Sequence, residues 1–197
     1  MKKIAVYGGS FDPPHMGHKL LAENLAELCG AEKVIIIPAS SSPFKNGGNA
    51  SGEHRLNMCK LLFNEPLFEV SDTELKRGGK SYTIDTLKEI KDIYPDSQMY
   101  LFMGDDMLLS FNRWYKYEEI LNICTIVAGC RESSLNKLSD MKEYADKLLG
   151  GQKNVLLCPC EPFEISSTQI REGLKKGVAA GVSDSVYDYI ISKELYQ

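Results

Sequence analysis

The stretch IAVYGGSFDPPHMGHKLLAENLAELCG, residues 4–30, joins an apolar run to a helical pattern through a loop rich in glycine, proline and histidine. The run IAVYG (4–8) is typical of a buried strand. Residues 19–30 have the apolar spacing of a helix, and Gly30 is placed to end it in a left-handed conformation. The loop between them therefore follows a strand and precedes a helix, where open α/β sheets bind their ligands.

Apolar runs and helical patterns alternate along the rest of the chain. Strands are expected at 34–38, 67–72, 98–104, 125–129 and 154–160, and helices at 53–63, 81–95, 117–123, 134–150, 167–176 and 184–195. Such alternation predicts a parallel sheet covered on both faces. Because no shift in composition marks a second domain, we expect one doubly wound, Rossmann-like α/β domain over residues 1–197, with C-terminal helices.

The composition is that of an ordinary globular protein, with 43% hydrophobic and 25% charged residues. No apolar run approaches the ~20 residues that cross a bilayer, and the first residues lack the apolar core of a signal peptide. We therefore expect a cytoplasmic protein without a membrane partner. The net charge of −4 argues against a nucleic-acid partner. The six cysteines lack the spacing of a zinc site and are interpreted as buried, reduced thiols.

The loop GGSFDPPHMGH (8–18) has the residues of a phosphate site. Its two glycines allow the backbone to approach a ligand closely, and Pro13 and Pro14 can preset the entry to a helix, since proline suits the first helical turn. His15 and His18 would share one face of that turn, beside free backbone N–H groups. The sequence therefore predicts a phosphate site without a P-loop lysine. The G-x-G-x-x-G dinucleotide pattern is absent, and two histidines are too few for a metal site.

A second anion site is indicated by EISSTQIREGL, residues 164–174. Ser166, Ser167 and Thr168 offer cap oxygens and backbone N–H groups at a helix start. Arg171 follows one turn later, with a charged fork that suits an anion. An ordinary N-cap with a surface arginine is the alternative. Two such helix starts, each after a buried strand, would hold one triphosphate from both sides.

These motifs resemble those of a known superfamily. G-x-F-D-P-x-H-x-G-H near the start and I-S-S-T-x-I-R near the end are similar to the signature pair of the nucleotidylyltransferase α/β superfamily. Within it, the sequence resembles the bacterial nicotinate mononucleotide adenylyltransferases over almost the whole chain. The other matching blocks are SYTIDTL (81–87), GDD with a later tryptophan (104–114), the arginine after TIVAGC (131) and VYDYIISKELY (186–196).

The resemblance implies transfer of AMP from ATP, which carries Mg²⁺, to nicotinate mononucleotide, giving deamido-NAD and pyrophosphate. ATP and nicotinate mononucleotide would be the partners; a homo-oligomer stays open, and no metal site on the protein is implied. Catalytic roles fall on His15, His18 and Arg171. ATP or phosphate contacts fall on Gly9, Ser10, Phe11, Lys45, Gly104, Asp106, Arg131, Ser167 and Thr168. Contacts with the nicotinate nucleotide fall on Tyr82, Thr83 and Trp114.

The residues by themselves leave alternatives open. Trp114 could equally fill the core, and the aspartate pair that follows the strand 98–104 could be a solvated loop. A phosphopantetheine adenylyltransferase, a cytidylyltransferase and a non-catalytic nucleotide sensor would all keep the phosphate site. SYTIDTL and Trp114 point to the nicotinate branch, since a phosphopantetheine adenylyltransferase would not require them.

One loop departs from the pattern of the branch. Where the branch usually reads P-x-x-P-P-H-K, this chain has PASSSPFK (38–45). Ser42 and Phe44 replace a proline and a histidine, while Lys45 remains in place. The common ATP machinery is thus intact, and the change concerns how this loop closes over the substrate.

Overall fold

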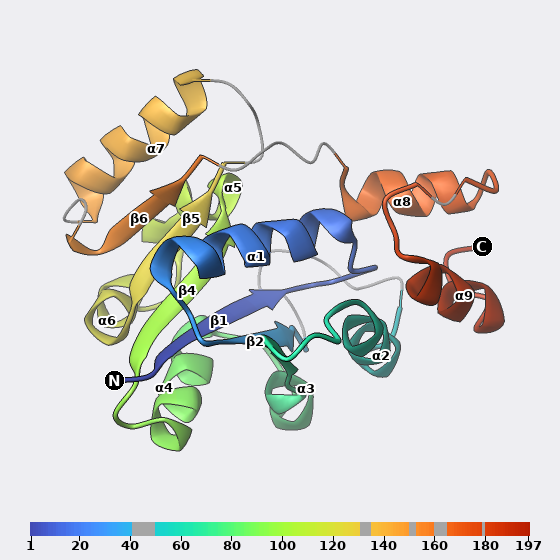
Figure 1. Cartoon of the computed structure of the whole chain (residues 1–197), viewed down its shortest axis with the longest axis horizontal. Helices are drawn as coiled ribbons and strands as arrows, with labels where there is room; N and C mark the ends of the chain where they lie inside the picture. The colour runs from blue at the N-terminus through green and yellow to red at the C-terminus, as the bar shows by residue number, and fades with distance from the viewer. Residues whose placement is uncertain (41–49, 131–134, 150–152, 160–164, 179) are drawn as a thin grey trace.

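A computed structural model describes residues 1–40, 50–130, 135–149, 153–159, 165–178 and 180–197 (Figure 1). The strands are β1 Lys3–Gly9, β2 Lys33–Pro38, β3 Phe68–Val70, β4 Gln98–Gly104, β5 Thr125–Gly129 and β6 Val155–Cys158. The helices are α1 Met16–Cys29, α2 Gly52–Leu62, α3 Thr73–Arg77, α4 Thr83–Ile93, α5 Asp105–Leu108, α6 Tyr117–Ile123, α7 Leu135–Leu148, α8 Ser167–Leu174 and α9 Asp184–Ser192, with a 3₁₀ turn η1 at Phe111–Arg113.

The strands form one parallel sheet in the order β3-β2-β1-β4-β5-β6. The chain begins at the centre with β1, runs outward to β3, and then crosses to β4 on the other side of β1. This is the doubly wound arrangement expected from the sequence. The direction of winding reverses between β1 and β4, so a crevice is expected beyond their carboxyl ends.

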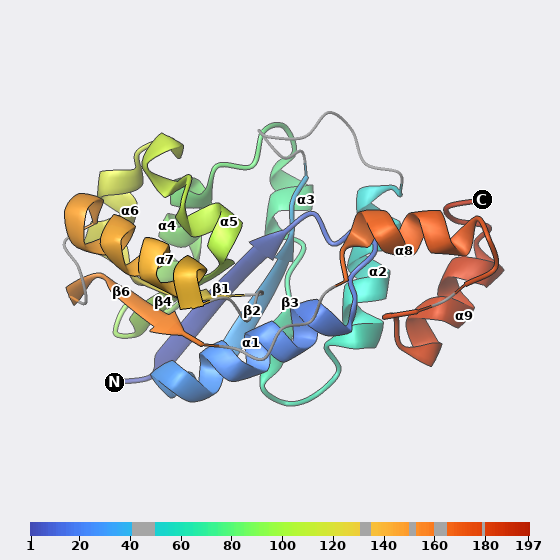
Figure 2. The same ribbon diagram turned by 90° about the horizontal axis from the view of Figure 1, so that it is seen from above.

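Helices cover both faces of the sheet, as predicted (Figures 1 and 2). Successive residues of β1 point to opposite faces, because the side-chain period of a strand is two. Ala5 and Tyr7 pack in one core cluster with α1, α2 and α9, whereas Ile4 and Val6 pack in a second cluster with α4, α6 and α7. Burial on both faces explains why the strands are continuous apolar runs rather than alternating ones.

Helices α8 and α9 extend the molecule beyond the carboxyl ends of β1 and β2 (Figures 1 and 2). Helix α9 packs on α2, and its buried Val186 and Ile190 belong to the same core cluster as α1. The C-terminal helices therefore lie at the edge of the sheet where the crevice is expected.

The elements predicted from the sequence are present within a few residues of their predicted ends. Gly30 ends α1 with a φ of 67°, the left-handed conformation expected there. Helix α3 was not predicted, because its sequence TELKR fills little more than one turn before Gly78 ends it. Five cysteines, Cys29, Cys59, Cys124, Cys130 and Cys158, are buried as expected, and Cys160 lies outside the described residues. In the part of the chain that the structure describes, no helix is long and apolar enough to span a membrane.

Candidate active site

A cavity of about 380 Å³ opens beyond the carboxyl ends of β1 and β4. Its walls come from the first loop, from the end of β4, and from the starts of α4 and α8. The lining residues are Val6, Tyr7, Gly8, Gly9, Ser10, Phe11, His15, His18, Ala39, Glu74, Ser81, Thr83, Thr86, Leu101, Phe102, Met103, Gly104, Asp106, Met107, Trp114, Ser166, Ser167, Thr168 and Arg171. We call the side formed by His15, His18, Ser167, Thr168 and Arg171 the phosphate end, and the side formed by Glu74, Thr83, Thr86 and Trp114 the ring end.

The two histidines lie together at the start of α1. His15 is the N-cap residue, with extended backbone angles of φ −146° and ψ 168°. Its backbone N–H donates to Nδ1 of His18 at 3.2 Å, and the two ring centroids are 3.7 Å apart. Because Nδ1 of His18 accepts this bond, a neutral His18 carries its proton on Nε2.

The prolines lie at the entry to α1, as the sequence analysis predicted. Helix α1 begins at Met16, after the His15 cap, so Pro13 and Pro14 precede its first turn. A residue that precedes proline is disfavoured in the helical conformation, so Pro13, which precedes Pro14, stays outside the helix. The Asp12–Pro13 peptide bond is cis. The prolines thus shape the approach to the helix rather than its first turn.

The first loop is closely packed at Gly9. A Cβ atom built on Gly9 would lie 3.1 Å from the ring of Phe11, closer than an ordinary van der Waals contact. The ring of Phe11 in turn packs edge-on against His18, with centroids 5.0 Å apart. Gly9 is therefore needed so that Phe11 can lie beneath the His18 ring.

The start of α8 is tied directly to the first loop. The hydroxyl of Ser167 donates to the carbonyl of Pro13 at 2.9 Å. Arg171 donates from Nη1 to the carbonyl of Asp12 at 2.6 Å and from Nη2 to the Thr168 hydroxyl at 3.1 Å. These contacts join residues 154 and 159 apart in sequence and bring the two predicted anion sites onto one wall of the cavity. The two helix starts converge as the sequence predicted.

A buried arginine that the sequence analysis did not single out braces the same wall. Arg55 of α2 is 6% exposed and donates from Nη1 to the carbonyl of Ser10 and from Nη2 to that of Ala39, each at 2.7 Å. Both carbonyls belong to residues that line the cavity. The signal was present in the sequence, since Arg55 lies on the same helical stripe as the buried Met58 and Leu62.

The ring end is formed by the start of α4 and by the segment after η1. Thr83 is the first residue of α4, and Trp114 packs against Phe111 with ring centroids 5.2 Å apart. Tyr82 does not line the cavity; its ring packs instead on Tyr115, 4.8 Å away. Of the three residues expected to contact the nicotinate nucleotide, Thr83 and Trp114 therefore face the cavity.

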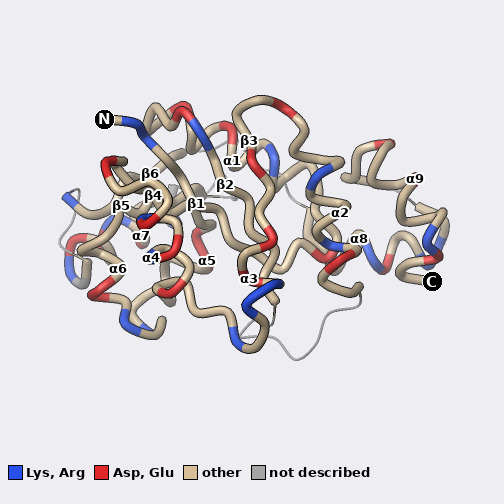
Figure 3. Tube along the Cα trace, turned by 90° about the horizontal axis from the view of Figure 1, so that it is seen from below, with Lys and Arg blue, Asp and Glu red and all other residues tan. Residues whose placement is uncertain are grey.

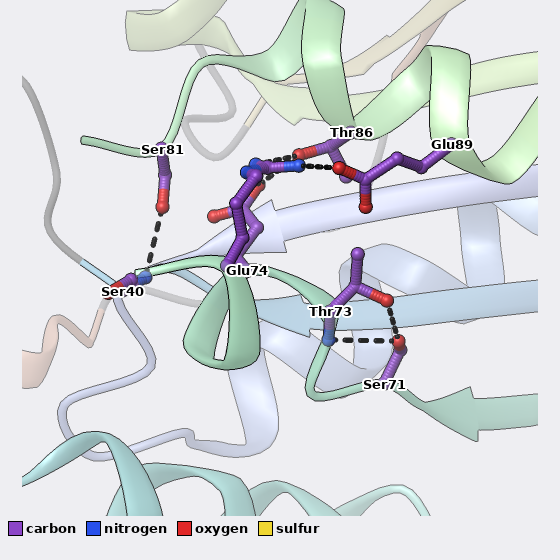
Figure 4. A network of polar contacts seen from close by, with 8 residues as sticks. Ser40, Ser71, Thr73, Glu74, Ser81, Thr86 and Glu89 are labelled. Atoms are coloured by element: carbon purple, nitrogen blue, oxygen red, sulfur yellow. Dashed lines mark hydrogen bonds and ion pairs between the residues drawn. The ribbon is translucent and has the colours of Figure 1, made fainter. Parts of the chain in front are cut away.

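A buried polar network supports the ring end (Figure 4). The Thr86 hydroxyl donates to Oε1 of Glu74 at 2.6 Å and accepts from Nη2 of Arg77 at 2.8 Å. Arg77 also donates to Glu89 at 2.6 Å. Figure 4 shows Glu74 of α3 close to Thr86 of α4. Glu74 and Thr86 were missed from the sequence because a five-residue helix gives no periodic pattern that would bring them together.

The segment before α4 is also held by a hydrogen bond between two loops. The backbone N–H of Ser40, after β2, donates to the hydroxyl of Ser81 at 3.0 Å (Figure 4). Ser81 lies two residues before α4 and lines the cavity. The approach to α4 is thus fixed from both sides, by the Ser40 contact and by the Glu74 network.

The aspartate pair after β4 divides between two roles. Asp105 is buried and forms an ion pair with Lys137 of α7, with 2.5 Å between Oδ2 and Nζ. Asp106 lines the cavity next to Gly104. Of the two aspartates, Asp106, the one selected from the sequence, therefore faces the cavity.

Some predicted residues cannot be placed. Lys45 and Arg131 lie outside the described residues, as do Ser42 and Phe44 of the divergent loop. Among the described residues, no group of three or more His, Cys, Asp or Glu side chains is arranged to hold a metal ion.

The sequence and the fold match known proteins. The model of the cytidylyltransferase-like family matches residues 6–173. A protein of Dehalococcoides mccartyi named "Probable nicotinate-nucleotide adenylyltransferase" is 38% identical over 199 residues, covering 98% of this chain and 97% of the relative. A protein of Aquifex aeolicus with the same name is 39% identical over 166 residues, covering 83% of this chain and 98% of the relative.

The fold is also similar to a solved structure, that of a Plasmodium falciparum nicotinic acid mononucleotide adenylyltransferase complexed with NaAD. The TM-score is 0.77 at 21% identity, covering 100% of this chain and 98% of that chain. At this identity the likeness concerns the fold alone.

Proposed function

This chain belongs to the cytidylyltransferase-like family, and on this premise we propose that it is a nicotinate-nucleotide adenylyltransferase. It transfers AMP from ATP to nicotinate mononucleotide, giving deamido-NAD and pyrophosphate for NAD biosynthesis. The names of relatives at 38% and 39% identity support this activity. The observation that carries the proposal is the convergence of two helix starts on one cavity whose other end presents a tryptophan and a third helix start.

The phosphate end suits a triphosphate. Backbone N–H groups at the starts of α1 and α8 offer partial positive charge to an anion. Nε2 of His18 can donate to the reacting α-phosphate, with His15 beside it. Arg171 already uses two donors on protein oxygens, and its remaining N–H groups are available to phosphate oxygens. We assign Gly9, Ser10, Phe11, Ser167 and Thr168 to the walls of this site.

The ring end suits the nicotinate nucleotide. The backbone N–H groups at Thr83, at the start of α4, can read the pyridine carboxylate as a helix N-terminus reads any anion. The indole of Trp114 can stack on the pyridine ring. Gly104 and Asp106, at the end of β4, are assigned to a ribose. Tyr82 acts through its packing on Tyr115, and Lys45 and Arg131 stay proposed phosphate contacts.

The chemistry requires alignment rather than a protein base. A phosphate oxygen of nicotinate mononucleotide attacks the α-phosphorus of ATP in line, and the bond to the β-phosphate oxygen breaks as pyrophosphate leaves. A phosphate monoester is already ionised near neutral pH, so no protein base is needed, and the direct in-line attack passes through no covalent intermediate on the protein. His18 and Arg171 stabilise the charge of the transferring group, and the cavity walls hold the two nucleotides in place.

We infer that ATP enters as its Mg²⁺ complex, because Mg²⁺ prefers phosphate oxygens and keeps several waters rather than filling an all-protein cage. The proposal treats residues 1–197 as one nucleotidylyltransferase domain acting on small molecules, without a nucleic-acid partner. Figure 3 supports that view, since Lys and Arg are interspersed with Asp and Glu along the described chain instead of gathering in one basic stripe. The buried thiols fit a cytoplasmic location.

Pyrophosphate release by the purified protein tests the proposal. With Mg²⁺ and ATP present, nicotinate mononucleotide, nicotinamide mononucleotide and phosphopantetheine are offered in separate reactions. We expect strong preference for the first. Release with phosphopantetheine alone would move the chain to another branch of the superfamily. ATP binding without release in any reaction would favour a nucleotide sensor.

A further inference from the structure

The block VYDYIISKELY, residues 186–196, has no part in the reaction described above, yet its last tyrosine reaches the phosphate end. The Tyr196 hydroxyl donates a 2.6 Å hydrogen bond to Oδ1 of Asp12, a contact that joins residues 184 apart in sequence. Both side chains are buried, at 8% and 6% exposure. A hydrogen bond to a carboxylate in a buried setting is stronger than one between neutral groups.

Asp12 is the point where several segments meet. Its Oδ1 also accepts the backbone N–H of Ala50 at 3.1 Å, and its backbone carbonyl accepts Nη1 of Arg171 at 2.6 Å. Through this one residue of the first loop, the C-terminal segment, the approach to α2 and the start of α8 are connected. The orientation of Asp12 therefore sets where one arm of the Arg171 guanidinium lies.

We propose that Tyr196 is a positioning residue for the phosphate end: by holding Asp12, it fixes the carbonyl that orients Arg171. Tyr196 does not line the cavity, so it acts through other residues and touches no substrate. The inference rests on the proposed function insofar as Arg171 binds the triphosphate of ATP.

The physical basis is preorganisation. The Arg171 fork is held at two points, the Asp12 carbonyl and the Thr168 hydroxyl, before the nucleotide arrives. If Asp12 turned, the first of these points would move, and binding would then have to order the guanidinium as well as the ligand. Burial and the hydrogen bond to Asp12 raise the pKa of the Tyr196 phenol, while Arg171 and Arg55 oppose that rise. The phenol consequently stays protonated and remains the donor.

The same block contains a matched control. The hydroxyl of Tyr189, on α9, lies 3.0 Å from Nδ1 of His54 and accepts from Nδ2 of Asn57 at 3.1 Å. Both partners belong to α2, and neither lines the cavity. Tyr189→Phe thus removes a hydroxyl that bridges α9 to α2 while leaving Asp12 untouched.

The experiment measures Mg·ATP binding by calorimetry for wild type, Tyr196→Phe and Tyr189→Phe, together with melting temperatures. We expect Tyr196→Phe to weaken Mg·ATP binding about tenfold, because it removes a hydrogen bond to a charged group. With nicotinate mononucleotide added, kcat should fall while KM for that substrate changes little. Tyr189→Phe should lower the melting temperature to a similar degree and bind Mg·ATP as wild type does.

Asp12→Asn provides a second variant that leaves the phenol in place and weakens the acceptor. We expect Mg·ATP binding about threefold weaker, since a neutral amide oxygen accepts a weaker bond than a carboxylate. In the Asp12→Asn background, Tyr196→Phe should weaken Mg·ATP binding by a smaller factor than it does in wild type, because the two residues act as one unit.

Equal losses of Mg·ATP binding in Tyr196→Phe and Tyr189→Phe would overturn the inference, as would wild-type binding in both Tyr196→Phe and Asp12→Asn. Because Mg·ATP binding needs no acceptor nucleotide, this result is separate from the proposed function. A wild-type protein that ignores nicotinate mononucleotide but binds Mg·ATP in a Tyr196-dependent way would refute the function and keep the positioning role.

Discussion

The phosphate end and the ring end of the cavity are built in different ways. At the phosphate end, side-chain donors bond to backbone carbonyls: Ser167 to Pro13, and Arg171 to Asp12. The segments involved come from opposite ends of the sequence. At the ring end, side chains bond to side chains, through Glu74, Thr86 and Arg77, within a short stretch in the middle of the chain.

This difference indicates what each end controls. Backbone carbonyls fix the path of the first loop, so the donors of the phosphate end are held in one geometry for a reacting group. The side-chain network of the ring end instead supports a helix start and an aromatic ring, which recognise an acceptor. Changes at the phosphate end should therefore act on turnover and ATP, and changes at the ring end on the affinity for nicotinate mononucleotide.

The largest effect is expected from His18→Ala at the phosphate end. Turnover should fall by about 10²-fold or more, by analogy with the loss of one oxyanion donor. The variant also loses the acceptor for the His15 N–H, so circular dichroism must confirm the fold. His54→Ala is the matched control, since this histidine lies outside the cavity and bonds to Tyr189. Near-normal kcat in a folded His18→Ala protein would contradict the assignment.

Trp114→Ala should show the opposite pattern at the ring end. Loss of stacking on the pyridine ring should raise KM for nicotinate mononucleotide by about tenfold, as for a base stacked on an aromatic side chain. Mg·ATP binding should stay at the wild-type level. Trp114→Phe, which retains a ring, should recover most of the loss. If Trp114→Ala instead weakened only Mg·ATP binding, Trp114 would belong to the other nucleotide.

Thr86→Val tests the polar network behind the same end. The substitution keeps the shape and removes the hydroxyl that links Glu74 to Arg77, so KM for nicotinate mononucleotide should rise about fivefold. Thr73→Val is a suitable control, because the Thr73 hydroxyl bonds to Ser71 at 2.7 Å and does not line the cavity. The network would have no role in recognition if both variants gave the same KM.

The smallest effect concerns an ion pair at the surface behind the ring end. Hydrogen bonds from Lys116 and from Lys88, a residue of α4, lower the pKa of the Glu119 carboxyl from its usual 4.5. Because the folded pKa is the lower one, these bonds stabilise the fold above pH 4.5 and are lost as pH falls through the folded value. All three side chains are exposed, so the contribution is small.

Glu119→Gln should accordingly lower the melting temperature slightly near neutral pH and leave it equal to wild type well below pH 4.5. Melting curves over this range measure the effect, with kinetics unchanged throughout. A difference that persisted in acid would show that Glu119 stabilises the fold by some other means.

Much of this architecture could be predicted from local patterns. The strands β1, β2 and β4 are continuous apolar runs, and helices such as α4 carry apolar residues at Ile84, Leu87 and Ile90, all buried. Their alternation was enough to predict the sheet and its carboxyl edge. The motif residues around His18 and Arg171 could be found because their chemistry is local to a helix start.

The remaining features depend on contacts that no local pattern encodes. The exact place of Pro13 relative to the helix start is not encoded locally, because proline suits both a first helical turn and an extended approach to it. In the sequence, Arg55 is one polar residue in a helix. Its role becomes clear only from its hydrogen bonds to the backbone carbonyls of Ser10 and Ala39. The bond from Tyr196 to Asp12 joins two residues that are far apart in sequence and of ordinary type.

The attachment of residue 196 to residue 12 has a consequence for how the protein is made. A ribosome releases the first loop early, while α8 and Tyr196 emerge much later. A nascent chain can already pair β1 with β2 and bring Ala50 to Asp12, but it lacks Arg171 and Tyr196 until synthesis has passed those residues. Before Tyr196 has been synthesised, the chain is therefore unable to bind a nucleotide tightly. Premature termination shortly before residue 196 should yield a protein that folds but binds nucleotide weakly.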